Sequence, residues 1–150
     1  MREIKFRAWD KVHECYLYDV QYAYDTLSGW VKYEDGENAD YDEDCFGGFL
    51  DNKQYAVEQY TGLKDKNGRE IYEGDVLRIE RDDNPNDNYI APVAWGGPDY
   101  PAFDIPWKYI PNNLYYDSNV LATIRAGESE EVMTVIGNIF ENPELLEASK

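Results

Sequence analysis

The chain has 150 residues, a net charge of −17 and 15% aromatic residues, among them 14 Tyr and 4 Trp. Its length suits one domain or two small subdomains that share a core, and its aromatic content argues against disorder. Nucleic acids and anionic membranes are bound mainly through Lys and Arg, so the charge disfavours both and predicts an acidic surface or a basic partner.

Alternating segments at the start predict β-strands. Residues 4–9 alternate apolar and charged side chains and predict a strand. Residues 15–24 alternate again and predict a second strand, with one face formed by Tyr16, Tyr18, Val20, Tyr22 and Tyr24. A tyrosine row of this period is typical of cross-strand packing rather than of a ligand platform. After a turn at Ser28-Gly29, residues 30–33 predict a short strand that pairs back.

An acidic run follows between residues 34 and 44. Its carboxylates are Glu34, Asp35, Glu37, Asp40, Asp42, Glu43 and Asp44, with no basic residue among them. Such a run repels itself and predicts an exposed loop. A site for a hard cation is the alternative, although the ligand spacing of a Ca²⁺ loop is absent. Whether the run binds a cation or a basic partner stays open, and Gly47-Gly48 then predicts a break in the chain.

Residues 60–76 carry the most ordered pattern of the sequence. Asn67-Gly68 predicts a hairpin with a type I′ turn, which requires positive φ at both central positions. A second turn follows at Gly74, where positive φ carries no steric penalty. Residues 76–81 then predict a strand, with Val76 buried on the opposite face from its alternating apolar residues.

The middle of the second half predicts short strands separated by irregular chain. Residues 82–88 form a polar loop by composition, and residues 89–95 predict a strand whose Pro92 suits a sheet edge. Residues 101–107 predict another edge strand. Residues 106–119 are irregular and rich in Pro, Asn and Tyr.

The end of the chain predicts one long strand and one short helix. Residues 120–125 fit either a strand or a short helix, and this choice stays open. Residues 131–140 predict the longest late strand, after an acidic turn at 127–131. Asn142 as N-cap and Pro143 at the first helical position begin a helix of one or two turns. Many short strands with turn signals make the fold mainly β.

The cysteines and the N-terminal residues indicate the cellular compartment of the protein. Cys15 and Cys45 form no CxxC pair, residues 1–6 lack the apolar core of a signal peptide, and no apolar run reaches the ~20 residues of a membrane span. We expect a cytoplasmic protein with reduced thiols, although a disulfide between the two stays open.

The sequence carries no recognisable catalytic motif. His13 is the only histidine, and its default interpretation is a solvated side chain. Cys15 lies two residues on, yet no nucleophile motif supports the pair. A calcium loop aligned on Gly68 would place Leu63 and Gly74 at ligand positions, which excludes it. We therefore predict no catalytic, cofactor-binding or metal-binding residue and no enzymatic activity.

Three blocks of the chain resemble the YopX family, small proteins of bacteriophages and prophages, mostly in Gram-positive bacteria. They are residues 4–10, residues 60–75 and residues 135–146, in the expected order and spanning nearly the whole chain. The segments between them, such as 34–44 and 98–119, have no counterpart. The resemblance implies a mostly β protein with an SH3-like barrel in its second half, encoded by a phage and acting in the host cytoplasm. It implies no catalytic residue.

These observations predict an aromatic-rich β subdomain over 1–59 and, over 60–150, a hairpin joint with an SH3-like barrel and a short C-terminal helix, together forming one compact unit. The leading hypothesis is a non-enzymatic protein-binding or regulatory module with an acidic surface and a host or phage protein as its partner. We place its function on the acidic and Tyr/Pro-rich loops.

Two other functions stay open. A hydrolase could use paired carboxylates or a metal, although with 31 acidic residues such pairs arise by chance. A nucleic-acid-binding protein would use a local basic patch formed by Lys64, Lys66, Arg69, Arg78 and Arg81. Homo-oligomerisation through edge strands and surface tyrosines also stays open, against the repulsion of −17 charges per chain.

Overall fold

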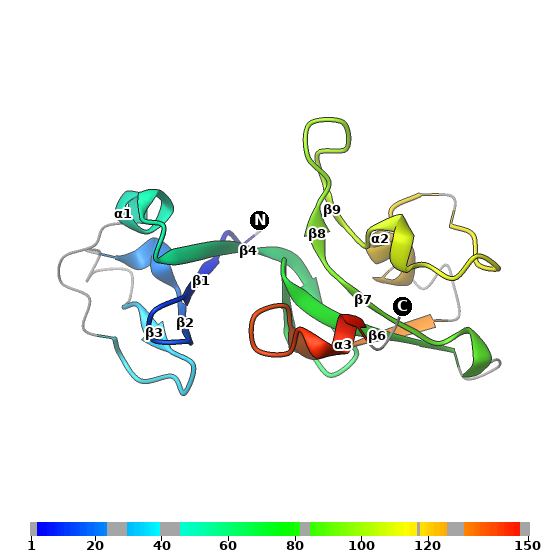
Figure 1. Cartoon of the computed structure of the whole chain (residues 1–150), viewed down its shortest axis with the longest axis horizontal. Helices are drawn as coiled ribbons and strands as arrows, with labels where there is room; N and C mark the ends of the chain where they lie inside the picture. Colours follow the sequence, from blue (N-terminus) through cyan, green and yellow to red (C-terminus); the bar gives the residue numbers. More distant parts are fainter. Residues whose placement is uncertain are drawn as a thin grey trace. The chain divides into compact units, whose positions relative to one another are not determined.

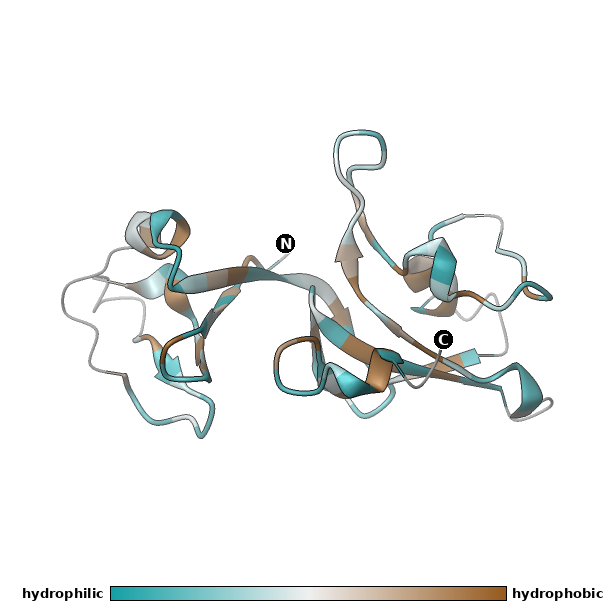
Figure 2. Ribbon diagram, viewed as in Figure 1, coloured by the Kyte–Doolittle hydropathy of each residue, from teal (hydrophilic) through white to brown (hydrophobic). Residues whose placement is uncertain are grey.

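The structure is a computed structural model that describes residues 3–23, 30–39, 46–81, 85–116, 118–125 and 131–147. The chain forms two compact units, Met1–Tyr60 and Thr61–Lys150. Antiparallel sheets and three short α-helices make up both, so the prediction of a mainly β fold is confirmed (Figure 1). Figure 2 shows hydrophobic residues spread through both units, in agreement with a separate core cluster in each.

The first unit is built around strand β1, Phe6–Asp10. β1 pairs on one side with β2, Cys15–Tyr18, and on the other with the first half of β4, Tyr55–Lys64. β3, Lys32–Tyr33, extends the sheet beyond β2. The 3₁₀-helix η1, Val20–Tyr22, and the helix α1, Phe46–Asp51, complete the described part of this unit, whose core contains Ala8, Leu17, Val20, Phe49 and Tyr55.

The predicted strand over 15–24 was too long. Asp19 adopts a left-handed conformation with φ of 61°, which ends β2 at Tyr18, and η1 follows it. The predicted strand face is therefore wrong for Val20 and Tyr22, which lie in η1 and not in a strand. The predicted break at Gly47-Gly48 is also wrong, because both glycines lie inside α1. Tyr24, Ser28-Gly29 and residues 40–45 lie outside the described part of the chain.

A buried ion pair crosses the first sheet. The Nε of Arg7 on β1 donates to Oε1 of Glu58 on β4 at 2.9 Å, and the hydroxyl of Tyr16 on β2 donates to the same oxygen at 2.9 Å. The guanidinium lies 4.4 Å from the centre of the Tyr16 ring. Arg7 is only 2% exposed, so the charged face of β1 is buried as well as its apolar face.

The second unit contains a three-stranded antiparallel sheet. Its order is β10 (Glu131–Asn138), β6 (Asp75–Arg81) and β7 (Tyr89–Pro92). β5, Glu70–Tyr72, pairs with the second half of β4, and β8 (Ala94–Trp95) forms a separate hairpin with β9 (Phe103–Asp104). Helix α2, Val120–Arg125, packs Val120, Leu121 and Ile124 into the same core as Leu77, Ile79, Met133 and Val135 of the sheet.

Shorter elements connect these strands. The 3₁₀-helices η2 (Pro85–Asp87) and η3 (Trp107–Tyr109) and the helix α3 (Glu144–Glu147) lie in loops of the second unit. The strands form open sheets, and no closed barrel is found among the residues that the structure describes. Within the same residues, no helix is both long and apolar enough to cross a membrane.

The central hairpin uses a different turn from the one predicted. Only Gly68 has positive φ, 84°, whereas Asn67 does not, so the turn is not type I′. The reason is Asp65, whose Oδ1 accepts the backbone N–H groups of Asn67 and Arg69, each at 2.9 Å. The amide of Gly68 also donates to the carbonyl of Asp65 at 3.0 Å, which closes a right-handed turn followed by the glycine.

Other predictions for this unit are confirmed or corrected by particular residues. Gly74 has φ of 85°, as the second turn requires, and Val76 is fully buried. Residues 120–125, which by sequence fit either a strand or a short helix, form helix α2. The strand predicted over 101–107 shrinks to β9. The side chain of Asn142 accepts the N–H of Asn138 at 3.2 Å, and helix α3 begins at Glu144, one residue later than predicted.

Candidate functional site

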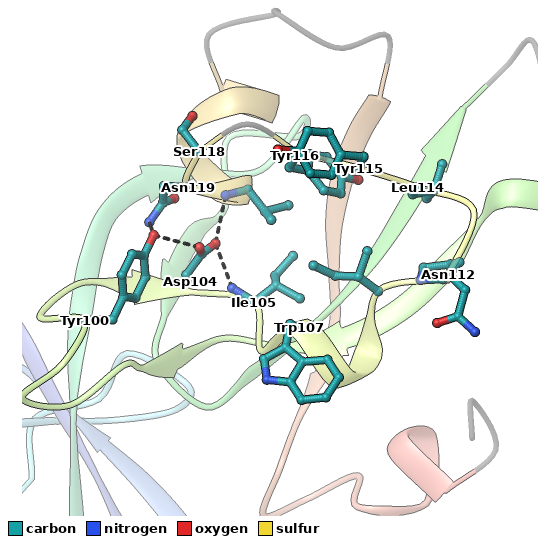
Figure 3. A pocket seen from close by; sticks show the side chains of 13 residues that line it. Tyr100, Asp104, Ile105, Trp107, Asn112, Leu114, Tyr115, Tyr116, Ser118 and Asn119 are labelled. Carbon is teal, nitrogen blue, oxygen red and sulfur yellow. Dashed lines mark hydrogen bonds between the residues drawn. The ribbon is translucent and has the colours of Figure 1, made fainter.

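The second unit contains an open hollow of about 650 Å³, which we call the aromatic hollow (Figure 3). It is formed by the segment that links β9 to α2 and lies mostly in the Tyr/Pro-rich loop. Its lining residues are Tyr100, Asp104, Ile105, Trp107, Ile110, Pro111, Asn112, Leu114, Tyr115, Tyr116, Ser118, Asn119 and Val120.

Two aromatic side chains of the hollow are almost fully exposed. Trp107, in η3, is 85% exposed, and Tyr115 is 86% exposed. They lie at opposite edges of the hollow (Figure 3). Neither ring has a hydrogen bond, ring contact or cation partner among the described residues. Large apolar rings kept in water are typical of surfaces that another molecule covers.

Asp104 holds the two walls of the hollow together. Its Oδ1 accepts the N–H of Val120 at 2.9 Å, at the first turn of α2. Its Oδ2 accepts the hydroxyl of Tyr100 at 2.9 Å. Asn119 closes the network, because its Nδ2 donates to the Tyr100 hydroxyl at 3.1 Å and its Oδ1 caps α2 by accepting the N–H of Ala122 at 3.0 Å (Figure 3). The hollow is thus shaped in advance by hydrogen bonds.

Gly96 fixes the position of Tyr100. A Cβ atom at Gly96 would lie 2.2 Å from the carbonyl oxygen of Tyr100, so only glycine fits this close approach. The N–H of Gly96 donates to the carbonyl of Ala102 at 2.9 Å, which closes the loop after β8. The left wall of the hollow in Figure 3 therefore depends on a glycine outside its lining.

A chain of hydroxyl groups anchors the opposite wall. The Tyr116 hydroxyl donates to the carboxylate of Glu131, at 2.8 Å from Oε1 and 2.7 Å from Oε2, and lies 2.8 Å from the hydroxyl of Tyr89. Burial, followed by these hydrogen bonds and the charge of Glu131, raises the pKa of Tyr116 above its usual value. Burial is also the first cause that raises the pKa of Tyr89 above its usual value.

Replacing Tyr116 by Phe is expected to lower the free energy of unfolding by about 1–3 kcal/mol, because Glu131 and the Tyr89 hydroxyl lose a buried partner. Urea denaturation followed by circular dichroism measures the change. Tyr115→Phe is the matched control: it removes an exposed hydroxyl and should change stability by less than about 0.5 kcal/mol. Equal effects of the two substitutions would contradict this role of Tyr116.

A second hollow of about 420 Å³ adjoins the first. The two share Tyr100, Asp104, Ile105 and Trp107, and the second adds the half-exposed ring of Trp95 on β8. Trp95 packs edge-on against Phe103 at 5.0 Å between ring centres. The exposed aromatic surface therefore continues from Tyr115 past Trp107 to the β8–β9 hairpin.

The carboxylates near the hollow are engaged in structural hydrogen bonds. Asp104 binds the start of α2, and Glu131 accepts from Tyr116 with both oxygens. The oxygens of both carboxylates are used in these hydrogen bonds and are not directed at a shared substrate position. The arrangement therefore does not support general acid–base chemistry at the hollow. Chemically, the hollow is suited to binding by apolar and aromatic contact.

His13 and Cys15 lie in the first unit. His13 is largely exposed, and its Nδ1 lies 2.7 Å from Oδ2 of Asp10. Asp10 also accepts the N–H groups of Val12 and His13, so this contact belongs to the turn between β1 and β2. Cys15 is half-buried at the start of β2, and Cys45 lies outside the described residues.

The acidic run is described only in part. Glu34, Asp35 and Glu37 are exposed, as predicted, whereas residues 40–44 lie outside the described part of the chain. Oε1 of Glu34 accepts the N–H of Tyr16 at 2.6 Å, and Oδ1 of Asp35 accepts the N–H of Glu37 at 2.9 Å. Among the described residues, no group of three or more His, Cys, Asp or Glu side chains is arranged to hold a metal ion.

The predicted basic patch is only partly assembled. Lys64 and Lys66 line a hollow of about 340 Å³ together with Arg125, which the sequence did not single out. Arg69, Arg78 and Arg81 do not line it. The remaining lining residues are Asp65, Ile124, Glu131, Val132 and Met133, so two carboxylates offset the positive charge.

Sequence reasoning placed function on the Tyr/Pro-rich loop but named no residue in it. The available signal was the density of Trp, Tyr and Pro between 106 and 116, in the segment predicted to be irregular. Such a segment cannot bury its rings through strand periodicity. The pairing of Asp104 with Val120 could not be inferred, because an aspartate between Phe and Ile reads equally well as a strand residue.

Comparison with known proteins identifies a matching family, and the similar solved structures include two described here. A sequence model described as YopX protein matches residues 5–147. Protein EF1440 from Enterococcus faecalis is 27% identical, with a TM-score of 0.58 over 97% of this chain and 99% of that chain. Protein yopX from Bacillus subtilis is 15% identical, with a TM-score of 0.46 over 97% of this chain and 98% of that chain. No curated protein matches the chain.

Proposed function

The chain belongs to the YopX family, and from this premise we propose that it is a non-enzymatic protein-binding module whose contact surface is the aromatic hollow. The observation that carries the proposal is the pair of unpartnered rings of Trp107 and Tyr115 at the edges of one preformed hollow. Trp and Tyr are the residues that most often dominate the binding energy of protein interfaces.

Two features of the hollow support a protein ligand. Its lining combines apolar residues, among them Ile105, Ile110 and Val120, with the polar residues Asn112 and Ser118. Protein interfaces likewise combine apolar and polar residues. Asp104 and Asn119 hold the hollow in shape before binding, which lowers the ordering cost of association.

The biological setting remains part of the proposal. We infer a protein encoded by a phage or prophage that acts in the host cytoplasm, with a host or phage protein as its partner. The SH3-like architecture implied for the second half is supported by the antiparallel order β10–β6–β7 and by the β8–β9 hairpin.

Replacing Trp107 by Ala tests the proposed surface. We expect the dissociation constant of the partner to rise at least about thirtyfold, as a hot-spot tryptophan is worth about 2 kcal/mol or more. Partners are captured on the immobilised full chain from a bacterial lysate, identified by mass spectrometry, purified, and titrated against both forms by calorimetry.

Trp30→Ala provides the matched control. Trp30 is 49% exposed but belongs to the first unit, so its loss should leave the titration unchanged. Circular dichroism checks that both variants are folded. A partner that binds the Trp107→Ala variant as tightly as the unaltered chain would show that the aromatic hollow is not the contact surface.

A further inference from the structure

We propose that the aromatic hollow is a receptor for positively charged side chains, so that its ligand is an extended, arginine- or lysine-containing segment of the partner protein. This inference rests on the proposed protein-binding function and names the chemistry of the bound segment. It is carried by the charges and the rings that surround the hollow.

Three carboxylates lie in the lining of the hollow or are hydrogen-bonded to residues in or next to it. Asp104 lies in its lining. Glu131 accepts from the lining residue Tyr116 at 2.7 Å. Asp87 accepts from Asn113, the neighbour of the lining residue Asn112, at 2.7 Å. Hydrogen bonds hold each of these carboxylates in or next to the lining of the hollow, where acidic groups favour a cationic ligand over an anionic one.

The lining itself contains no Lys, Arg or His. The nearest basic residue in sequence is Lys108, which directly follows Trp107. Its ammonium lies 5.3 Å from the centre of the Tyr109 ring, and Tyr109 is not a lining residue. A cationic ligand would therefore meet no positive charge in the lining itself. Lys108 beside Trp107, and the basic residues that share a hollow with Glu131 (Lys64, Lys66 and Arg125), are the groups that would weaken its binding.

The exposed rings supply the specific contact. A cation within about 6 Å of a Trp or Tyr ring centre is attracted to the negative face of the ring, and Trp is the best partner. This chain already uses the same contact internally, since Arg7 lies 4.4 Å from the Tyr16 ring centre and Lys5 lies 5.6 Å from that of Tyr60. Trp107 and Tyr115 have no such partner among the described residues.

The titration of Tyr100 points in the same direction. Burial is the first cause that raises its pKa, and the hydrogen bond to Asp104 and the charge of that carboxylate raise it further. Burial is likewise the first cause that raises the pKa of Tyr89, and the charges of Glu131 and Asp104 raise it further. Burial would disfavour a cation as well as a phenolate, so only the carboxylate contributions to these pKa shifts reflect the negative charge that would attract a guanidinium or an ammonium group.

A nucleic acid is the less favoured occupant. Aromatic rings stack on bases, but single-stranded nucleic acids also need a basic groove along the backbone. The carboxylates and the net charge of −17 would repel phosphates at this surface. A basic peptide satisfies both the rings and the charge.

The probe is a short blocked peptide of alternating glycine and arginine, and its matched control is the same peptide with citrulline, a neutral isostere, in place of arginine. Each is titrated into the ¹⁵N-labelled full chain, and the indole N–H signals of the four Trp residues report the site. We expect the Trp107 indole to shift, with binding of the arginine peptide about fivefold or more tighter than binding of the citrulline peptide. Added salt should weaken the arginine peptide.

Variants sharpen the test. Trp107→Ala and Tyr115→Ala should each weaken the arginine peptide about fivefold, Trp107→Phe less, and Lys108→Ala should strengthen it. Trp30→Ala should change nothing. Equal binding of the two peptides at Trp107 would overturn the cationic ligand while leaving a protein-binding hollow. Absence of arginine-peptide binding at millimolar concentration would also overturn it, and the partner titration of Trp107→Ala then judges the proposed function separately.

Discussion

Replacing Glu58 by Gln is expected to lower the free energy of unfolding of the first unit by about 3–5 kcal/mol, because it removes the carboxylate that pairs with the buried guanidinium of Arg7. Arg7 and Glu58 are 2% and 5% exposed, so water cannot take the place of the lost carboxylate. The Tyr16 hydroxyl donates to the same oxygen and would meet an amide instead. The effect should be the largest of any single substitution on β1, β2 or the first half of β4.

Chemical denaturation of the full chain, followed by hydrogen exchange of the amides of β1 and β2, measures this loss in the first unit itself. Glu37→Gln is the matched control, since Glu37 is an exposed carboxylate of the same unit. Methionine at both Arg7 and Glu58 should recover part of the stability, because an apolar pair carries no unpaired buried charge. A single variant as stable as the double variant would show that the lost charge is not the cause.

Replacing Asp65 by Ala is expected to destabilise the second unit by about 3 kcal/mol, since unsatisfied buried N–H groups cost about 1–3 kcal/mol each. Its carboxylate accepts three of them. Oδ1 takes those of Asn67 and Arg69, and Oδ2 takes that of Val135 on β10 at 3.0 Å. The substitution therefore loosens the central turn and its attachment to β10 together.

The same carboxylate makes this stability dependent on pH. Burial alone would raise the pKa of Asp65, but the N–H groups of Val135, Arg69 and Asn67, with the charge of Arg69, outweigh it and lower the pKa. Since the folded-state pKa lies below the unfolded value of about 3.9, the contribution is complete above that value and is lost as the pH falls through the folded-state pKa.

Urea denaturation at pH 7 and near pH 3 separates these effects. The unaltered chain should lose stability on acidification, and the Asp65→Ala variant should lose less. Asp99→Ala, which removes an exposed carboxylate from the same unit, should behave like the unaltered chain at both values. An Asp65→Ala variant with the full pH dependence would assign that dependence to other carboxylates, such as Asp10.

Local signals in the sequence were sufficient where one residue decides the backbone. Gly74 required a turn and adopts positive φ, and the alternation of residues 76–81 produced β6. The same reasoning failed where a side chain reached back to the backbone. Asp65 imposes a right-handed turn on a dipeptide that by itself favours type I′, and Asp19 enters a left-handed conformation that ends a strand.

Contacts between distant residues could not be predicted from either pattern. Arg7 and Glu58 are 51 positions apart, and each on its own strand reads as a solvated charge. The aromatic hollow depends in the same way on Asp104, which binds the amide of Val120 across 16 positions. The aromatic composition of the loop was visible in the sequence. The hydrogen bond between Asp104 and the N–H of Val120, which shapes the loop into a hollow, was not.

The strand β4 has a practical consequence for dividing this protein. The boundary between the two units falls at Tyr60 and Thr61, inside a ten-residue strand rather than in a linker. On one side the amide of Tyr60 donates to the carbonyl of Lys5 at 2.9 Å, and on the other the hydroxyl of Thr61 donates to the carbonyl of Ile71 at 2.7 Å. Either half expressed alone would begin or end on a severed strand, so gene truncation at this boundary removes hydrogen-bonded backbone from the fold it is meant to isolate.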